Sequence, residues 1–184
     1  SQKINGHKAH DHLYRIFFYD CEPIQKKMHN PISKKSIDFS KSMEAVFRLE
    51  LHKELIKKRK VALRLGKLSS DANWVFKPNV AEDLLKKRKT LEDITEDDVM
   101  LSVRQKGVDM RIALDISSIT LKRQANRIVL ISGDSDFVPA AKFARREGID
   151  FILDPMWQRI PDDLHEHIDG LRTVYKKPSP PSEI

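Results

Sequence analysis

A short aliphatic run that leads directly into a cluster of small and acidic residues most constrains the fold. Residues 128–131 (IVLI) are entirely aliphatic, and residues 132–136 (SGDSD) follow them. A run of this kind is typical of a strand buried on both faces of a parallel sheet. A helix over 137–146, ended by Gly148, and a strand over 151–153 come next. Strand, helix and strand within about 25 residues predict a right-handed crossover between parallel strands.

The remaining periodicities fit the same architecture. Apolar residues at Met43, Val46, Phe47, Leu51 and Leu55 recur at helical spacing after a cap at Ser40 or Ser42. We predict further helices after a cap at Asn79, over 108–123 and over 161–168, and strands over 14–19, over 61–65 before Gly66, and over 74–76. The predicted fold class is therefore α/β, with three layers and a mainly parallel sheet.

The length of 184 residues is sufficient for one domain, which we expect to cover residues 13–175. Residues 1–12 are polar and aperiodic, which predicts a flexible lead-in. Residues 176–184 are rich in Pro and Ser, which predicts a disordered tail. The formal net charge is +7, which favours association with a polyanion.

Several classes of protein and site are disfavoured. The apolar runs are far shorter than the roughly 20 residues of a membrane span, so we expect no membrane partner. No signal peptide opens the sequence, and we expect a cytoplasmic protein. The single cysteine, Cys21, excludes an intrachain disulfide and a cysteine-built zinc site. The glycine motifs of dinucleotide and P-loop sites and the nucleophile elbow of serine hydrolases are absent from the sequence.

Carboxylates follow the ends of two predicted strands. Asp134 and Asp136 come after the strand at 128–131, and Asp20 ends the strand at 14–19. In an open parallel sheet the functional crevice lies beyond the carboxyl ends of the strands. Asp109 opens a predicted helix, and we expect it to face this crevice. Asp115 lies six residues further on and points about 120° away, so the two need not serve one site.

Carboxylates that converge in one crevice repel each other unless a cation neutralises them. A set of hard oxygen ligands with few nitrogen or sulfur ligands favours Mg²⁺ or Mn²⁺. Such an ion activates water and stabilises charge on a phosphodiester oxygen. The hydroxyls of Ser132 and Ser135, with the amides after Gly133, could hold a phosphate at the start of the following helix.

Each of these residues also has a purely structural interpretation. Asp134 and Asp136 could cap a helix, and Asp115 could pair with a basic side chain. The basic runs at 57–64 and 86–89 could be solvated surfaces or could follow a phosphate backbone.

The chain resembles an NYN domain of the LabA-like kind, within the PIN-like nuclease superfamily. The resemblance is in matching order over roughly residues 13–155 and rests on the segments 14–20 (YRIFFYD), 64–68 (RLGKL), 105–109 (QKGVD) with Asp115, and 130–139 (LISGDSDFVP) with Gly148.

The resemblance implies a Rossmann-like α/β/α sandwich and a ribonuclease site that uses Mg²⁺ or Mn²⁺. By matching motif, Asp109, Asp134 and Asp136 would be catalytic metal ligands, with Asp115 as a further acid. The family's first strand ends in a metal-binding Asp. Asp20 is one candidate for that residue. The better match for residues 14–20 is the family's second strand, so we expect the first strand to be missing from this sequence.

Two functions follow as hypotheses. The first is a metal-dependent nuclease acting on RNA, with DNA as an alternative substrate, in which Lys106 and the basic runs contact phosphates. The second is a catalytically inactive NYN-fold module that binds RNA or a protein partner. A phosphatase could use the same acids, but this sequence does not carry the acidic motif that we would expect directly at the end of a strand in such an enzyme. Homo-oligomerisation is compatible with either function.

Overall fold

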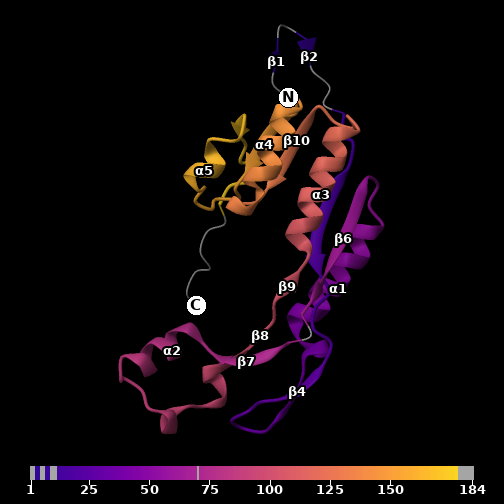
Figure 1. Cartoon of the computed structure of the whole chain (residues 1–184). Helices are drawn as coiled ribbons and strands as arrows, with labels where there is room; N and C mark the ends of the chain where they lie inside the picture. Colours follow the sequence, from indigo (N-terminus) through magenta and orange to yellow (C-terminus); the bar gives the residue numbers. More distant parts are fainter. Residues whose placement is uncertain (1–2, 5–6, 9–11, 70, 178–184) are drawn as a thin grey trace. The chain divides into compact units, whose positions relative to one another are not determined.

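The computed structural model describes residues 3–4, 7–8, 12–69 and 71–177, which form two compact units (Figure 1). The middle unit comprises residues 15–108, and the C-terminal unit comprises residues 1–14 and 109–184. The expectation of one domain over residues 13–175 stays a prediction.

The middle unit combines strands with α-helices and short 3-10 helices. Its elements, with η for 3-10 helices, are β3 (Ile16–Cys21), β4 (Lys27–His29), β5 (Ser36–Asp38), η1 (Phe39–Lys41), α1 (Met43–Ile56), β6 (Val61–Leu68), β7 (Asn73–Phe76), α2 (Pro78–Leu85), η2 (Leu91–Asp93), η3 (Glu96–Asp98), β8 (Val99–Ser102) and β9 (Gln105–Lys106).

The centre of the middle unit is the parallel pair β3 and β6, with α1 in the connection between them. The aromatic and aliphatic residues that predicted the first strand do form it, but β3 starts at Ile16 and extends to Cys21. Asp20 therefore lies within the strand rather than after it. The predicted cap of α1 is confirmed, because the hydroxyl of Ser42 accepts a hydrogen bond of 3.1 Å from the amide of Ala45.

Only the C-terminal part of the apolar stripe that predicted α1 packs, because Leu51 and Leu55 are half-buried. Met43 and Phe47 are 90% and 64% exposed, whereas Ala45 and His52 are buried. The small side chain of Ala45 lets the helix backbone approach its neighbours closely, and His52 contacts Asp20 of β3. A polar contact and a small residue, rather than the largest apolar side chains, therefore set the rotation of this helix.

Gly66 does not end the strand that we predicted over residues 61–65. β6 continues to Leu68, and β9 pairs with its last part in antiparallel orientation. A Cβ atom at Gly66 would lie 2.7 Å from Cγ2 of Val108, 2.9 Å from Sγ of Cys21 and 2.9 Å from the carbonyl oxygen of Lys106. Glycine is required here because three neighbours approach the strand closely.

Two antiparallel ribbons extend the middle unit. β4 pairs with β5, and β7 pairs with β8, which confirms the short strand predicted over 74–76. The helix that we expected after a cap at Asn79 begins two residues earlier, at Pro78, with Lys77 as the capping residue and Asn79 inside the helix. Proline suits a first helical turn, because its missing N–H has no partner there in any helix.

The C-terminal unit contains the predicted crossover. Its elements are β1 (Lys3–Ile4), β2 (His7–Lys8), α3 (Val108–Leu121, which begins at the unit boundary), β10 (Arg127–Ile131), η4 (Ser135–Phe137), α4 (Val138–Arg146), β11 (Asp150–Asp154), α5 (Asp162–His165) and β12 (Gly170–Leu171). β10 and β11 are parallel, and α4 connects them. Gly148 after α4 has φ +84°, as expected for a residue that ends a helix. The helix expected over 161–168 is a single turn, α5.

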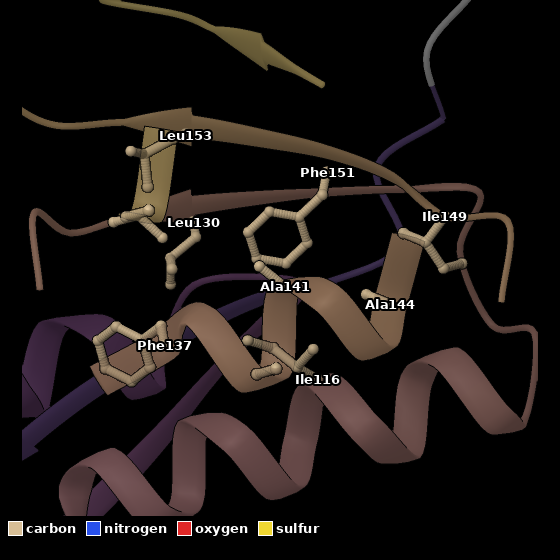
Figure 2. Close-up of a cluster of buried hydrophobic side chains, with 10 residues drawn as sticks. Ile116, Leu130, Phe137, Ala141, Ala144, Ile149, Phe151 and Leu153 are labelled. Carbon is tan, nitrogen blue, oxygen red and sulfur yellow. The ribbon is translucent and has the colours of Figure 1, made fainter. Parts of the chain in front are cut away.

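The core of this unit lies between the strands and two helices. Figure 2 shows Phe151 of β11 pointing towards Ala141 of α4, with Leu153 beside Leu130 of β10 and with Ile116 of α3 on the other side of α4. The alanines of α4 allow this helix to lie close to the sheet. α3 packs by one stripe of its surface, since Ile116 and Ile119 are buried and Ile112 packs against the core.

One face of β10 is more open than its sequence predicts. Leu130 is buried, but Val129 and Ile131 are 42% and 63% exposed. The core cluster packs against the face of β10 that carries Ile128 and Leu130, and Val129 and Ile131 lie on the opposite face. The prediction of burial on both faces is wrong for this strand.

Both units combine helices with strands, which confirms a mixed α/β class. The strand pairs β3–β6, β10–β11 and β11–β12 are parallel. In the predicted lead-in, β1 and β2 pair with each other. The other residues of the segment 1–12 except His12, and residues 178–184 of the predicted tail, lie outside the described residues. Within the described part of the chain, the helices are too short or too polar to cross a membrane.

Candidate functional site

The carboxyl ends of β10 and β11 lie at the same edge of the sheet in the C-terminal unit. The two strands are parallel, and Ile131 at the end of β10 is in register with Asp154 at the end of β11. The loops that follow both strands therefore emerge side by side. Side chains from these two loops and from the strand ends are therefore placed to contact a ligand at this edge.

The loop after β10 is held by its own polar groups. The hydroxyl of Ser132 accepts a hydrogen bond of 3.2 Å from the amide of Asp134. Oδ1 of Asp134 in turn accepts one of 2.9 Å from the amide of Asp136 and caps η4. The capping interpretation of Asp134 is thus confirmed. The capping hydrogen bond occupies only one carboxylate oxygen of Asp134. The side chains of Asp134 and Asp136 are both exposed to solvent.

The loop after β11 contacts the loop after β10. A Cβ atom at Gly133 would lie 2.8 Å from Oε1 and 3.3 Å from Cβ of Gln158, so the two loops lie close together at this point. Met156 and Trp157 both have positive φ values, 49° and 67°, a conformation that costs energy for residues with side chains. Nε1 of Trp157 donates to the carbonyl oxygen of Tyr175. This edge therefore has a defined and partly strained backbone.

Sequence reasoning missed one carboxylate at this edge. Asp154 is 3% exposed, and its Oδ1 accepts a hydrogen bond of 3.0 Å from the amide of Met156. The rule that drew attention to Asp20, an acid at the end of an apolar strand, applies equally to Asp154 and could have found it.

The two acids of α3 have different surroundings. Asp109 lies in the first turn of the helix and is exposed, where the positive end of the helix dipole favours a carboxylate. Asp115 lies in the middle of the same helix, one residue before the buried Ile116. Among the described residues there is no group of three or more His, Cys, Asp or Glu side chains arranged to hold a metal ion. The assignment of Asp109, Asp134, Asp136 and Asp115 to one metal site stays a prediction.

Asp20 is held by side chains of its own unit. Its Oδ2 lies 2.9 Å from Nε2 of His52, and its Oδ1 accepts from Arg48 at 3.2 Å and from the amide of Cys21 at 2.8 Å. Arg48 also pairs with Glu44. Both oxygens of Asp20 thus have partners, and a metal ion would have to compete with a cation and an imidazole for this carboxylate.

Lys106, the predicted phosphate contact, lies in β9 and is exposed. It stands directly across from Lys67 of β6 in the antiparallel pair. Directly opposed residues in such a pair project from the same face of the sheet, with Cβ atoms about 5 Å apart. The pairing therefore places two ammonium groups on one surface. Their repulsion is unfavourable in the free protein, and a bound anion would reduce it.

The basic run at 86–89 is largely neutralised by neighbouring acids. Lys86 pairs with Glu82, and Lys89 pairs with Asp98 at 2.7 Å. The hydrogen bond from Lys89, with others from Thr95, lowers the pKa of Asp98 from 3.8 to about 2. This segment fits the interpretation of a solvated surface better than that of a phosphate-binding surface.

The Asp134 loop supplies hard oxygen donors with room for water. Mg²⁺ commonly binds one or two carboxylates, keeps several waters, and takes further oxygens from a substrate phosphate. The carboxylates of Asp134 and Asp136, with the Ser135 and Ser132 hydroxyls nearby in the chain, suit that coordination chemistry. A zinc site of thiolates and imidazoles does not fit the same loop.

Comparison with known proteins gives one family. A family model described as NYN domain matches residues 18–166, which include both the Asp20 strand and the Asp134 loop. No curated protein and no solved structure matches the chain. The matched range covers most of the 184 residues and confirms the resemblance to an NYN domain.

Proposed function

Because the chain belongs to the NYN domain family, whose members are typically metal-dependent nucleases, we propose that it is a ribonuclease that uses Mg²⁺ or Mn²⁺. The general nuclease role follows from the family. The preference for RNA, the identity of the ion and the LabA-like subtype belong to the proposal, as does a three-layer sandwich with a mainly parallel sheet. DNA is the alternative substrate.

One observation carries the proposal. Asp134 and Asp136 are solvent-accessible carboxylates directly after a parallel strand, and hydrogen bonds within the loop fix their backbone. A ligand that is fixed before the ion arrives loses less conformational entropy on binding. The cap uses Oδ1 of Asp134, and Oδ2 takes no part in it.

In this proposal Asp134 and Asp136 hold the ion, and Asp109 contributes from the first turn of α3. A divalent ion, when bound, supplies Lewis acidity towards water and towards the phosphodiester oxygens. Ser132 and Ser135 bind and orient the phosphate.

Positive charge outside the acidic loop contributes to the binding of RNA in this proposal. Lys106 attracts the RNA backbone and contributes to binding rather than to bond cleavage. Its effect should weaken as the salt concentration rises, because the interaction releases counterions.

Cleavage of a single-stranded RNA with and without Mg²⁺ tests the proposal. We expect cleavage that stops on chelation and in Asp134→Asn. Asn caps a helix about as well as Asp, so the variant should keep its thermal stability in the absence of metal. It should lose the rise in melting temperature that Mg²⁺ gives the wild type.

Asp97→Asn is the matched control, since Asp97 is an acid in η3, another one-turn helix. It should behave as the wild type in both assays. Cleavage that survives in Asp134→Asn, or an unchanged shift with Mg²⁺ in that variant, would refute the assignment.

A second candidate is a catalytically inactive module that binds RNA or a protein partner. The ion pair of Asp20 with Arg48 favours it, because a strand-end carboxylate that is already neutralised has less affinity for a metal ion. Binding of RNA that falls with salt, without cleavage in Mg²⁺ or Mn²⁺, would favour this candidate over the nuclease.

A further inference from the structure

A cavity of about 600 Å³ opens in the middle unit beyond the carboxyl ends of β3 and β6. The segment 22–26, which follows β3, forms one wall, and residues 65–69 at the end of β6 form another. Ala72 and Val103, which flank the β7–β8 ribbon, complete it. Both the position at the ends of parallel strands and the volume are typical of small-ligand sites.

The lining separates apolar from polar groups. Ile24 and Leu68 are half-buried, as are the smaller apolar residues of the walls. Gln25, Lys26 and Lys67 are exposed and belong to the rim. Such a cavity suits a flat ligand with apolar faces, a hydrogen-bonding edge and an attached anion.

Hydrogen bonds that involve the backbone fix the segments that line the cavity. The amide of Ser69 donates to the carbonyl oxygen of Arg104 at 2.8 Å, and the Ser69 hydroxyl accepts from the amide of Asp71 at 3.3 Å. Gly66 fits closely between its neighbours. A cavity that exists before the ligand arrives requires little reorganisation on binding.

The rim carries more positive than negative charge. Lys26 and Lys67 outnumber Glu22 among its charged groups. Lys67 also stands across from Lys106, so two like charges face each other at this end of β6. Like charges directly opposed across strands are destabilising, and a bound phosphate would relieve that repulsion.

We propose that this cavity binds one nucleotide, with the base against Ile24 and Leu68 and the phosphate at Lys26 and Lys67. Gln25, and Glu22 beside it, hydrogen-bond the edge of the base. This assignment rests on the proposed function, in which single-stranded RNA is the substrate. It adds a second site, which binds one unstacked base of that RNA. Unstacked bases in apolar pockets are the usual targets of single-strand recognition.

Binding is measured with the full chain and a fluorescein-labelled octaadenylate RNA, in chelator so that no cleavage occurs. Lys26→Ala/Lys67→Ala should weaken binding about tenfold. It should also reduce the salt dependence of log Kd by about 0.7 for each phosphate that the removed lysines had neutralised. The control, Lys41→Ala/Lys53→Ala, removes two exposed lysines in η1 and α1 that lie outside the cavity lining and outside the basic runs, and it should bind RNA as the wild type does.

A variant that leaves the charge unchanged distinguishes the contribution of the cavity to RNA binding from that of general electrostatic attraction. Ala72→Phe places a ring in the cavity, and we expect about tenfold weaker binding with an unchanged salt dependence. Circular dichroism and a thermal melt establish that the variant is folded. The two double-lysine variants alter only exposed side chains and should fold. They therefore still test the proposal if Ala72→Phe does not fold.

Competition with adenosine 5′-monophosphate distinguishes the two sources of a nucleotide. Displacement of the RNA by the mononucleotide, lost in Ala72→Phe, assigns the cavity to a free nucleotide. Binding of the octamer alone, weakened by the same variant, assigns it to a residue within a chain. Equal binding of both ligands by wild type and both cavity variants overturns the proposal.

The failure of this proposal is distinct from the failure of the nuclease. If cavity variants bind and cleave as the wild type does while Asp134→Asn abolishes cleavage, the nuclease stands and the cavity is not a nucleotide site. If the wild type does not cleave RNA but cavity variants lose binding, the cavity assignment stands without the nuclease.

Discussion

Replacement of Asp20 by Ala should destabilise the middle unit by about 2–4 kcal/mol. The carboxylate side chain is 15% exposed, and its two charged or ring partners, Arg48 and His52, are 30% and 6% exposed. A buried hydrogen bond to a charged group contributes about 1.5–3 kcal/mol, and its removal leaves the partner without an acceptor. Breaking a fully buried pair costs about 3–5 kcal/mol. The estimate is lower here because Arg48 keeps contact with water and Glu44.

Urea unfolding followed by tryptophan fluorescence measures this effect. The chain contains two tryptophans, Trp74 in the middle unit and Trp157 in the C-terminal unit. A Trp157→Phe background makes the signal specific to the middle unit. Glu44→Ala is the matched control, because Glu44 contacts the same Arg48 but is 75% exposed. A surface pair of this kind contributes about 0–1 kcal/mol.

His52→Ala and the double variant with Asp20→Ala complete a double-mutant cycle. A coupling energy of about 1–2 kcal/mol is expected for residues in direct contact. If Asp20→Ala costs no more than Glu44→Ala, the inference that Asp20 anchors α1 is wrong. If Asp20→Asn abolishes the Mg²⁺-induced rise in melting temperature, Asp20 is a metal ligand and the structural interpretation fails.

Three further predictions concern stability. Gly66→Ala should cost about 1–3 kcal/mol in urea unfolding, because its methyl group would lie 2.7–2.9 Å from atoms of three neighbours; an unchanged midpoint would refute the close approach. Phe151→Ala should cost about 3–5 kcal/mol in the C-terminal unit, since Phe151 is fully buried; a loss under about 1 kcal/mol would contradict that core. The pKa of Asp98 is lowered from 3.8 to about 2, chiefly by Lys89 and then by Thr95, so this carboxylate stabilises the segment above about pH 4. That contribution should disappear as the pH falls from about 4 to 2, and amide protection around Thr95, measured relative to the intrinsic exchange rate at each pH, should fall over that range, whereas Asp98→Asn should show no such change.

The fold was most predictable where local pattern and tertiary packing agree. The aliphatic run at 128–131, the helix that Gly148 ends and the strand at 151–153 form the expected crossover. α1 was predictable as a helix but not in its orientation. Helical spacing marked Met43 and Phe47, but the contact of His52 with Asp20 set the buried face. A long-range polar contact of this kind has no signal in a local window.

The candidate site was predictable to a similar extent. The cap that Asp134 provides follows from a carboxylate placed just before a helix, and the structure contains it. The burial of Asp154 required knowledge of how β11 sits in the sheet. The close approach of Gln158 to Gly133 joins residues 25 positions apart and is a property of the folded chain alone. The cavity beside Lys67 likewise depends on separate segments of the chain.

The burial of Cys21 makes the chain's single thiol a reporter of local opening. Cys21 is 0% exposed and lies in register with Gly66, where β3 and β6 fit closely together. A thiol reagent can reach its Sγ only when these two strands separate. At low reagent concentration the labelling rate therefore gives the free energy of opening under native conditions, without denaturant. Because no other cysteine is present, this measurement reads the middle unit alone, and it would show directly how far a bound nucleotide suppresses its opening.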